Sequence, residues 1–108
     1  MAEWVTPKEL FEWVKQQKPL TLVDVRMGQV GGFIPGSRHI PVLDLEDEPQ
    51  AWDPETSVVV YCQFGKGASD YAAEVLEQQG VAGVYKLQGG FDAWLKFLAS
   101  REQDESGV

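Results

Sequence analysis

The sequence predicts an α/β fold of three layers, in which a mainly parallel, five-stranded sheet lies between helices. Two observations predict this fold. First, segments with helical and with strand patterning alternate along the chain, which is typical of parallel strands joined by helical crossovers. Second, the run from residue 20 to 25 (LTLVDV) is apolar on both of its faces, as in a strand that helices cover on both sides.

The first helix has the clearest start. Thr6 is suited to the N-cap, Pro7 to the first helical position and Glu9 to the closing of a capping box, and Pro19 stops the helix. The other elements follow from apolar periodicity and turn residues. The expected strands are 3–5, 20–25, 38–42, 57–61 and 83–87, and the expected helices cover 70–79 and the segment after residue 90, with a helical turn at 44–48.

Length and charge restrict the class of protein. With 108 residues the chain has the size of one domain, and we expect residues 1–100 to form it and the polar residues 101–108 to be a disordered tail. The net charge of −8 argues against nucleic acid and anionic membrane as partners. The chain starts without signal-peptide features and has no apolar run of spanning length. One cysteine cannot form an intrachain disulfide, so we expect a reducing, cytoplasmic location.

The stretch around Cys62 is the most informative about function. Four residues of high β-propensity, 58–61, lead into this only cysteine, and a loop with two glycines follows before a helix opens near Ser69. A thiolate is favoured at such a place, because a helix N-terminus carries partial positive charge and unpaired N–H groups. The backbone of the loop can also converge on an anion. A lone cysteine after an apolar strand is commonly an inert core residue, but this loop favours a nucleophile.

Other polar residues are better explained without chemistry. His39 is the only histidine, and we expect it to satisfy a turn rather than to form a Cys–His dyad. The acidic run 44–48 matches no calcium loop and is expected to be a solvated face. Residues 65–69 (GKGAS) are similar to the end of a P-loop motif, but the first glycine of that motif is absent, because position 60 is Val60. Lys66 is either a surface lysine or the cation that attracts an anionic substrate. One cysteine and one histidine form no metal-ligand set, and no cofactor is expected.

Four segments together resemble single-domain rhodaneses, a family of sulfurtransferases. Residues 22–26 (LVDVR) are similar to the family's first strand and Asp-x-Arg turn, and residues 32–41 (GFIPGSRHIP) to its G-H-I-P-G-A-x-x-I-P segment. Residues 58–62 with Gly65 resemble the active-site strand and loop. Residues 84–94 (VYKLQGGFDAW) match the last strand, double-glycine turn and helix. These segments occur in the family's order and span nearly all of residues 4–99.

The resemblance implies a sulfurtransferase or persulfide carrier with the rhodanese-like fold. Cys62 would attack the outer sulfur of a donor such as thiosulfate and form a persulfide, and cyanide or a thiol would then accept that sulfur. The implied partners are a small sulfur-containing anion or persulfide donor and a thiol acceptor, either a small molecule or a protein. The implied substrate-binding residues follow Cys62 directly: Gln63, Phe64, Gly65, Lys66, Gly67, Ala68 and Ser69.

The loop departs from the family's C-x-x-G-x-R-S pattern. Gly67 stands in the place of the arginine, or Ala68 does if one residue is inserted near Gly67, and Phe33 replaces the histidine of G-H-I-P. These changes imply poorer use of thiosulfate, a dianion, and leave open a non-catalytic interaction or sensing module. The longer loop also leaves open the phosphatase and arsenate-reductase branch. The arginine of its C-x5-R motif is here Ala68, which removes bidentate oxyanion binding.

Overall fold

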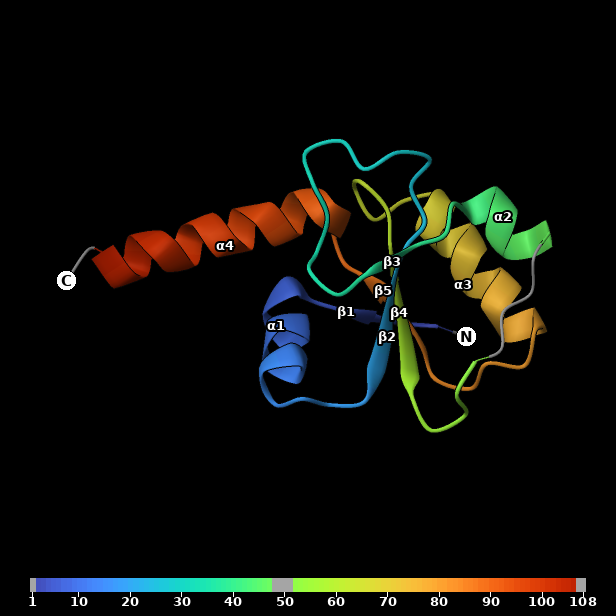
Figure 1. The fold of residues 1–108 in the computed structure, drawn as a ribbon. Helices are drawn as coiled ribbons and strands as arrows, with labels where there is room; N and C mark the ends of the chain where they lie inside the picture. Colours follow the sequence, from blue (N-terminus) through green and yellow to red (C-terminus); the bar gives the residue numbers. More distant parts are fainter. Residues whose placement is uncertain (1, 48–51, 107–108) are drawn as a thin grey trace.

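The computed structural model describes residues 2–47 and 52–106, and it confirms the predicted α/β fold. The five strands are all parallel and lie in the order β1-β5-β4-β2-β3 (Figure 1). The strands are β1 (Glu3–Val5), β2 (Leu20–Asp24), β3 (Arg38–His39), β4 (Ser57–Tyr61) and β5 (Val84–Leu87). The helices are α1 (Pro7–Lys15), α2 (Val42–Asp47), α3 (Ala68–Gln78) and α4 (Gly90–Ser106).

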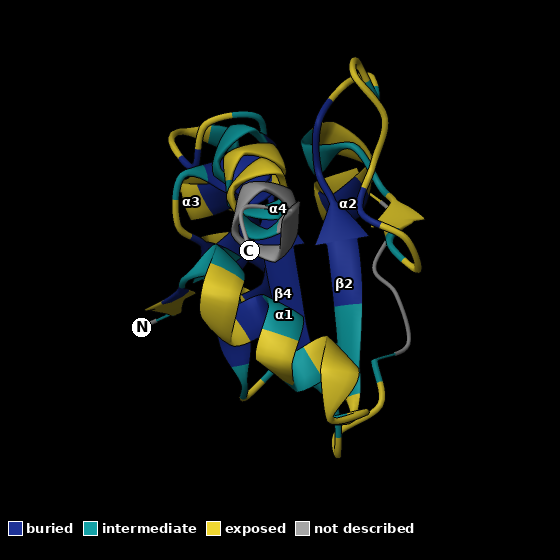
Figure 2. Ribbon diagram, turned by 90° about the vertical axis from the view of Figure 1, so that its left-hand side faces the viewer, coloured by how far each residue is buried: buried dark blue, intermediate teal, exposed yellow. Residues whose placement is uncertain are grey.

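The central strand β4 divides the interior into two cores, one on each face of the sheet. Val58, Val60 and Cys62 belong to a cluster that includes Leu45 of α2 and four apolar residues of α3. Val59 and Tyr61 belong to a second cluster, to which α1 contributes Leu10 and α4 contributes Phe91 and Trp94. Because successive side chains of a strand point to opposite faces, α2 and α3 cover one face and α1 and α4 the other. Figure 1 shows the sheet edge-on between these layers, and Figure 2 shows most of β2 and β4 coloured as buried.

The capping box predicted at the start of α1 is confirmed. The Glu9 N–H donates to Thr6 Oγ1 at 3.1 Å, and the Thr6 N–H donates to Glu9 Oε1 at 3.0 Å. Pro7 occupies the first turn, where its missing N–H costs nothing. The local sequence therefore fixes where the chain leaves β1 and begins α1.

Several element boundaries differ from the predicted ones, and β2, β5 and the end of α3 do so by a single residue. The helix after the Cys62 loop begins at Ala68, two residues earlier than expected, and β3 is only two residues long because Pro41 lacks the N–H that a longer strand would use. The predicted turn at 44–48 is part of α2, apart from Glu48, which lies outside the described residues.

The last helix is longer than the sequence predicts. It continues to Ser106 and projects away from the layers in Figure 1. The division of the chain at residue 100 and the disorder of the tail stay predictions. None of the helices in the described ranges is both long and apolar enough to cross a membrane.

Candidate functional site

Cys62 lies at the carboxyl edge of the sheet, directly after β4. Its neighbour strand β2 pairs with β4 in a register that sets Asp24 beside Tyr61, and the Val25 N–H donates to the Tyr61 carbonyl at 3.0 Å. The segments that follow the two strands, which carry Arg26 and Cys62, therefore leave the sheet side by side. This edge is where parallel α/β sheets form their sites.

The thiol of Cys62 is almost completely buried and lines a pocket. The residue is 4% exposed, and its Sγ–H donates to the carbonyl oxygen of Lys66 at 3.3 Å. The pocket has a volume of about 370 Å³ and is bounded mostly by apolar groups. Its walls come from the segments after β2, β3 and β4: Val25, Arg26, Met27, Val42, Cys62, Gln63, Phe64, Lys66 and Ala68.

The structure brings most of the predicted site residues to this pocket. Besides Cys62, these are Gln63, Phe64, Lys66 and Ala68. Gly65 lines a neighbouring hollow of about 550 Å³, which also reaches Trp4 and shares Phe64 and Lys66 with the first.

Gly67 and Ser69 line neither of these two hollows. Ser69 is fully buried in the first turn of α3, and its Oγ has no hydrogen-bond partner among the described residues. A buried hydroxyl without a partner is costly.

The loop after Cys62 is held through its backbone by the start of α4. The Phe91 N–H donates to the Cys62 carbonyl at 2.8 Å, and the Asp92 N–H donates to the Gln63 carbonyl at 2.9 Å. Gly90 has a φ of +64° and lies so close to the loop that an added Cβ would come within 2.5 Å of the Cys62 carbonyl oxygen. The Gly89-Gly90 turn is therefore a requirement of the site as well as a link between β5 and α4.

Arg26 uses every N–H of its guanidinium within the protein. Nε and Nη2 donate to the Asp24 carboxylate at 2.9 and 2.7 Å. The remaining N–H groups donate to the carbonyl of Val30 at 3.0 Å, to the carbonyl of Gly32 and to Gln63 Oε1 at 2.9 Å. Because a guanidinium has five donors, Arg26 has none left for a substrate anion, although it lines the pocket.

The Asp24–Arg26 pair shifts the titration of its members and of Tyr61. Burial alone would raise the pKa of Asp24, but hydrogen bonds from Arg26 and the charge of Arg26 lower that pKa below its usual value. The hydrogen bond with Asp24 raises the pKa of Arg26. Burial raises the pKa of Tyr61, whose O–H donates to Asp24 Oδ2 at 3.1 Å. Asp24 therefore stays ionised and Tyr61 protonated near neutral pH.

Neither His39 nor any acidic side chain of the described residues lines the Cys62 pocket. The Nε2 atom of His39 lies 2.7 Å from the carbonyl oxygen of Arg26, which agrees with the structural role predicted for this residue. In residues 2–47 and 52–106, no three side chains of His, Cys, Asp or Glu gather closely enough to hold a metal ion.

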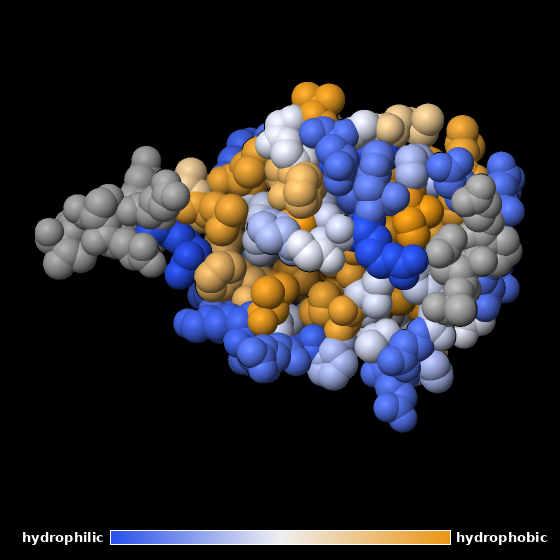
Figure 3. All heavy atoms as spheres, viewed as in Figure 1, coloured by the Kyte–Doolittle hydropathy of each residue, from blue (hydrophilic) through white to orange (hydrophobic). Residues whose placement is uncertain are grey.

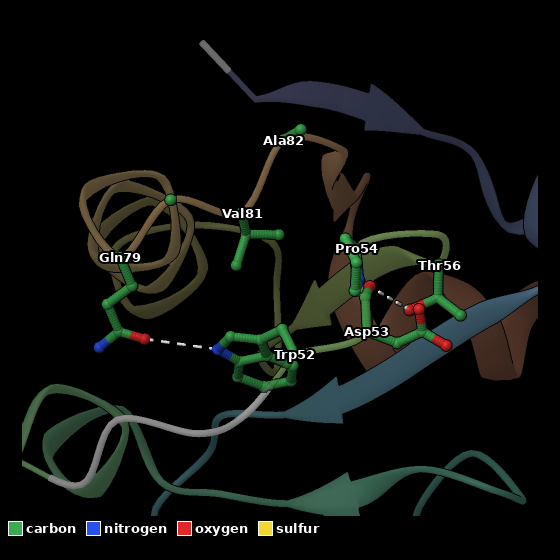
Figure 4. Close-up of a pocket in the computed structure, with 8 residues that line it drawn as sticks. Trp52, Asp53, Pro54, Thr56, Gln79, Val81 and Ala82 are labelled. Atoms are coloured by element: carbon green, nitrogen blue, oxygen red, sulfur yellow. Dashed lines mark hydrogen bonds between the residues drawn. The ribbon is translucent and has the colours of Figure 1, made fainter.

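Another pocket, of about 180 Å³, lies near Trp52 (Figure 4). It is formed by the residues that precede β4 and β5, among them Asp53, Thr56 and Val81. It therefore lies at the amino edge of the sheet, away from Cys62. A weak 3.4 Å hydrogen bond joins Trp52 Nε1 to Gln79 Oε1, and we assign this pocket no chemistry.

The predicted site did not include four residues that line the Cys62 pocket and lie far from Cys62 along the chain. Val25 and Met27 flank Arg26 after β2, and Val42 follows β3. The rule that sites form where neighbouring parallel strands end would have pointed to these segments. The strand order was needed to apply it, because only the sheet shows that β2 lies beside β4.

The family model of the rhodanese-like domain matches residues 6–97, which is most of the chain. The chain belongs to the rhodanese-like family. A curated relative, the thiosulfate sulfurtransferase GlpE of Pseudomonas fluorescens (strain SBW25), is 33% identical over 90 residues. The match covers 82% of this chain and 81% of that protein.

Solved structures with similar folds carry more than one description. A rhodanese-like domain protein from Staphylococcus aureus has a TM-score of 0.76 at 28% identity, covering 85% of this chain and 90% of that one. A protein from Rhodopseudomonas palustris described as a possible tyrosine phosphatase has a TM-score of 0.73 at 27% identity, covering 88% of this chain and 80% of that one. The rhodanese-like fold alone therefore does not choose between sulfur transfer and phosphate chemistry.

Proposed function

We propose that this protein is a sulfurtransferase or persulfide carrier that uses Cys62 as its nucleophile. The observation that carries the proposal is the position of Cys62: it lines a pocket at the carboxyl edge of a rhodanese-like sheet, at the start of the loop that leads into α3. The relative named thiosulfate sulfurtransferase supports the same reaction class.

The proposed reaction has two steps. The Cys62 thiolate attacks the outer sulfur of thiosulfate, an S–S bond forms to Cys62, and sulfite leaves with the electron pair of the broken bond. A thiol or cyanide then attacks the outer sulfur of the persulfide and regenerates the Cys62 thiolate. Covalent catalysis of this kind replaces one direct transfer between two anions by two easier transfers.

The loop residues have proposed roles in holding negative sulfur. We expect backbone N–H groups of residues 63–69 to stabilise the persulfide, since this loop leads into the N-terminus of α3. Lys66 would attract the donor anion. Ser69 is included because its buried Oγ lacks a partner in the described part of the chain.

Intact-protein mass spectrometry tests the proposal. After incubation with thiosulfate or with an organic persulfide, the protein should gain the mass of one sulfur atom, and a reducing thiol should remove it. The Cys62→Ser variant should gain nothing under the same conditions. If the wild-type protein gains no sulfur from any sulfane donor, the protein is not a sulfur carrier, and a non-catalytic interaction or sensing module becomes the better interpretation.

Phosphatase or arsenate-reductase chemistry is the second candidate, because the similar structure from R. palustris is described as a possible tyrosine phosphatase. The pocket argues against this chemistry. Ala68 occupies the position of the oxyanion-binding arginine, and the guanidinium of Arg26 is fully engaged elsewhere. Turnover of an aryl phosphate that depends on Cys62 would restore this candidate.

A further inference from the structure

We propose that the peptide group between Lys66 and Gly67 is a conformational switch for the Cys62 thiol. In the conformation of this structure the peptide holds the thiol in its protonated form, and it turns over when the thiol ionises. The inference goes beyond sulfur transfer, because it concerns how the thiolate becomes available for any reaction. Three observations carry it: the hydrogen bonds of this peptide group, the backbone conformation of Gly67 and the charges around the sulfur.

The peptide group is held from two opposite sides. The Cys62 Sγ–H donates to the Lys66 carbonyl oxygen at 3.3 Å. The Gly67 N–H of the same peptide donates to Asp70 Oδ2 at 3.3 Å, on the exposed side of the loop. The C=O and N–H of a trans peptide point in opposite directions, so the carbonyl faces the sulfur and the N–H faces away from it. An ionised sulfur has no proton to donate, and the negative end of the carbonyl dipole would repel it.

Rotation of this peptide by half a turn would stabilise the thiolate. The rotation exchanges the two directions, so that the Gly67 N–H points towards the sulfur and the Lys66 carbonyl towards solvent. The thiol proton passes to water, and a hydrogen bond from an N–H to an anion replaces one between neutral groups. Asp70 loses the Gly67 N–H but keeps its ion pair with Lys86 at 2.9 Å. No carboxylate is therefore left without a partner by the rotation.

Gly67 has a backbone conformation that favours the rotation. Its φ of +69° and ψ of −88° belong to a strained region that L side chains rarely adopt. The rotation takes φ to negative values, which every residue can adopt. Lys66 and Gly67 are exposed, and Figure 3 shows hydrophilic and hydrophobic atoms side by side on the surface at the end of the molecule that carries the carboxyl-edge loops. The outer side of this peptide is therefore free of core packing.

The charged groups near the sulfur do not replace this backbone change. Arg26 and Lys66 line the pocket, and Asp24 neutralises Arg26 at 2.7 Å. Lys66 is exposed and has no ion-pair partner within residues 2–47 and 52–106. The helices around the sulfur add no charged side chain to the pocket in these ranges, since Asp70 of α3 is paired with Lys86 on the exposed side. The carbonyl is the group in contact with the thiol.

The rate of alkylation by iodoacetamide as a function of pH tests the switch. The reagent is uncharged, and the pH of the half-maximal rate reports the ionisation of the thiol. Gly67→Ala is the decisive variant, because an added Cβ meets no atom within 4 Å and therefore acts only through the backbone conformation. It disfavours the positive φ of the protonated form. We expect the half-maximal pH to fall by about one unit, with alkylation about tenfold faster below it.

Gly80→Ala is the matched control. Gly80 has a φ of +91° and no atom within 4 Å of an added Cβ, and it does not line the Cys62 pocket. It imposes a similar backbone strain away from the thiol and should leave the pH profile unchanged. A loop that is merely loosened would raise the rate at every pH without moving the half-maximal pH, so the profile separates rotation from easier access.

Two substitutions of Asp70 test the other side of the peptide. Asp70→Asn and Asp70→Ala both remove the negative charge and the ion pair with Lys86. Only Asp70→Asn keeps an oxygen that can accept from the Gly67 N–H. The half-maximal pH should therefore lie about half a unit lower in Asp70→Ala than in Asp70→Asn, because the hydrogen bond that holds the protonated form is lost.

The outcomes of these measurements are independent of sulfur transfer, because iodoacetamide carries no sulfur. A half-maximal pH of Gly67→Ala equal to or above that of the wild type overturns the switch. Equal values for the two Asp70 variants also overturn it. In either case the proposal of a sulfurtransferase or persulfide carrier stands, whereas a failure of sulfur to reach Cys62 overturns that proposal and leaves the switch standing.

Discussion

Two regions that line the same pocket are held in opposite ways. The cluster around Arg26 is fixed through side chains, each paired with another part of the protein. The loop from Cys62 to Ala68 is fixed mainly through its backbone, which packs against Gly90; of its side chains, Gln63 accepts a hydrogen bond from Arg26, while Phe64 and Lys66 are exposed. A charged residue beside a pocket is therefore not always available to bind a ligand. Here the charge of Arg26 is used within the protein, and that of Lys66 is available.

Removal of the Arg26 guanidinium should have the largest effect. Arg26→Met would leave the Asp24 carboxylate buried without its partner, which typically costs about 3–5 kcal/mol of the free energy of unfolding. Urea denaturation measures the loss. A change below about 1 kcal/mol would show that Arg26 is not the structural element described above, and that its charge is available for a ligand.

Gly90→Ala should have the next largest effect on the free energy of unfolding. This substitution tests whether the Cys62 loop is held through its backbone. The added Cβ would meet the Cys62 carbonyl at 2.5 Å in addition to the strain of a positive φ. Gly80→Ala is the matched control, since Gly80 has a φ of +91° and no atom within 4 Å of the added Cβ.

We expect Gly80→Ala to cost about 1–2 kcal/mol and Gly90→Ala about 2 kcal/mol more, measured by thermal or urea unfolding. Gly90→Ala should also slow persulfide formation. Equal losses in the two variants would contradict the close packing of the Gly89-Gly90 turn on the Cys62 loop.

The Arg26 region also predicts a dependence of stability on pH. Because the folded-state pKa of Asp24 is lowered, the unfolded chain takes up the proton more readily, and this part of the stability is present above the unfolded pKa of about 3.9. It should be lost as the pH falls from there through the lowered folded-state pKa. Asp24→Asn should flatten the fall in unfolding free energy between pH 5 and pH 2, and an unchanged slope would contradict the assignment.

Lys66→Gln should have the smallest effect on stability and a selective effect on activity. Because Lys66 is exposed and unpaired in the described ranges, unfolding free energy should change by less than about 0.5 kcal/mol. The kcat/KM for anionic donors should fall about three- to tenfold. Added salt should lower kcat/KM less in the variant than in the wild type. Equal kcat/KM values for the variant and the wild type at low salt would show that Lys66 does not attract the donor.

The sequence predicted the scaffold well because the scaffold depends on local signals. Alternating apolar patterns, the Thr6 capping box and the double-glycine turn each determine an element without knowledge of its neighbours. The pocket could be predicted only in part, since Val42 and Met27 reach Cys62 through the strand order. The commitment of Arg26 to Val30, Gly32 and Gln63 also depends on loop geometry that residue types do not encode.

The most direct test of the central claim follows the sulfur atom itself. Thiosulfate labelled with a heavy isotope in its outer sulfur is mixed with the protein, the Cys62 peptide is analysed, and cyanide is then added. We predict that the label appears on Cys62 and afterwards in thiocyanate, in equal amounts. Label that reaches thiocyanate without passing through Cys62 would contradict the account, and so would a failure of both labelled thiosulfate and a labelled organic persulfide to place label on Cys62.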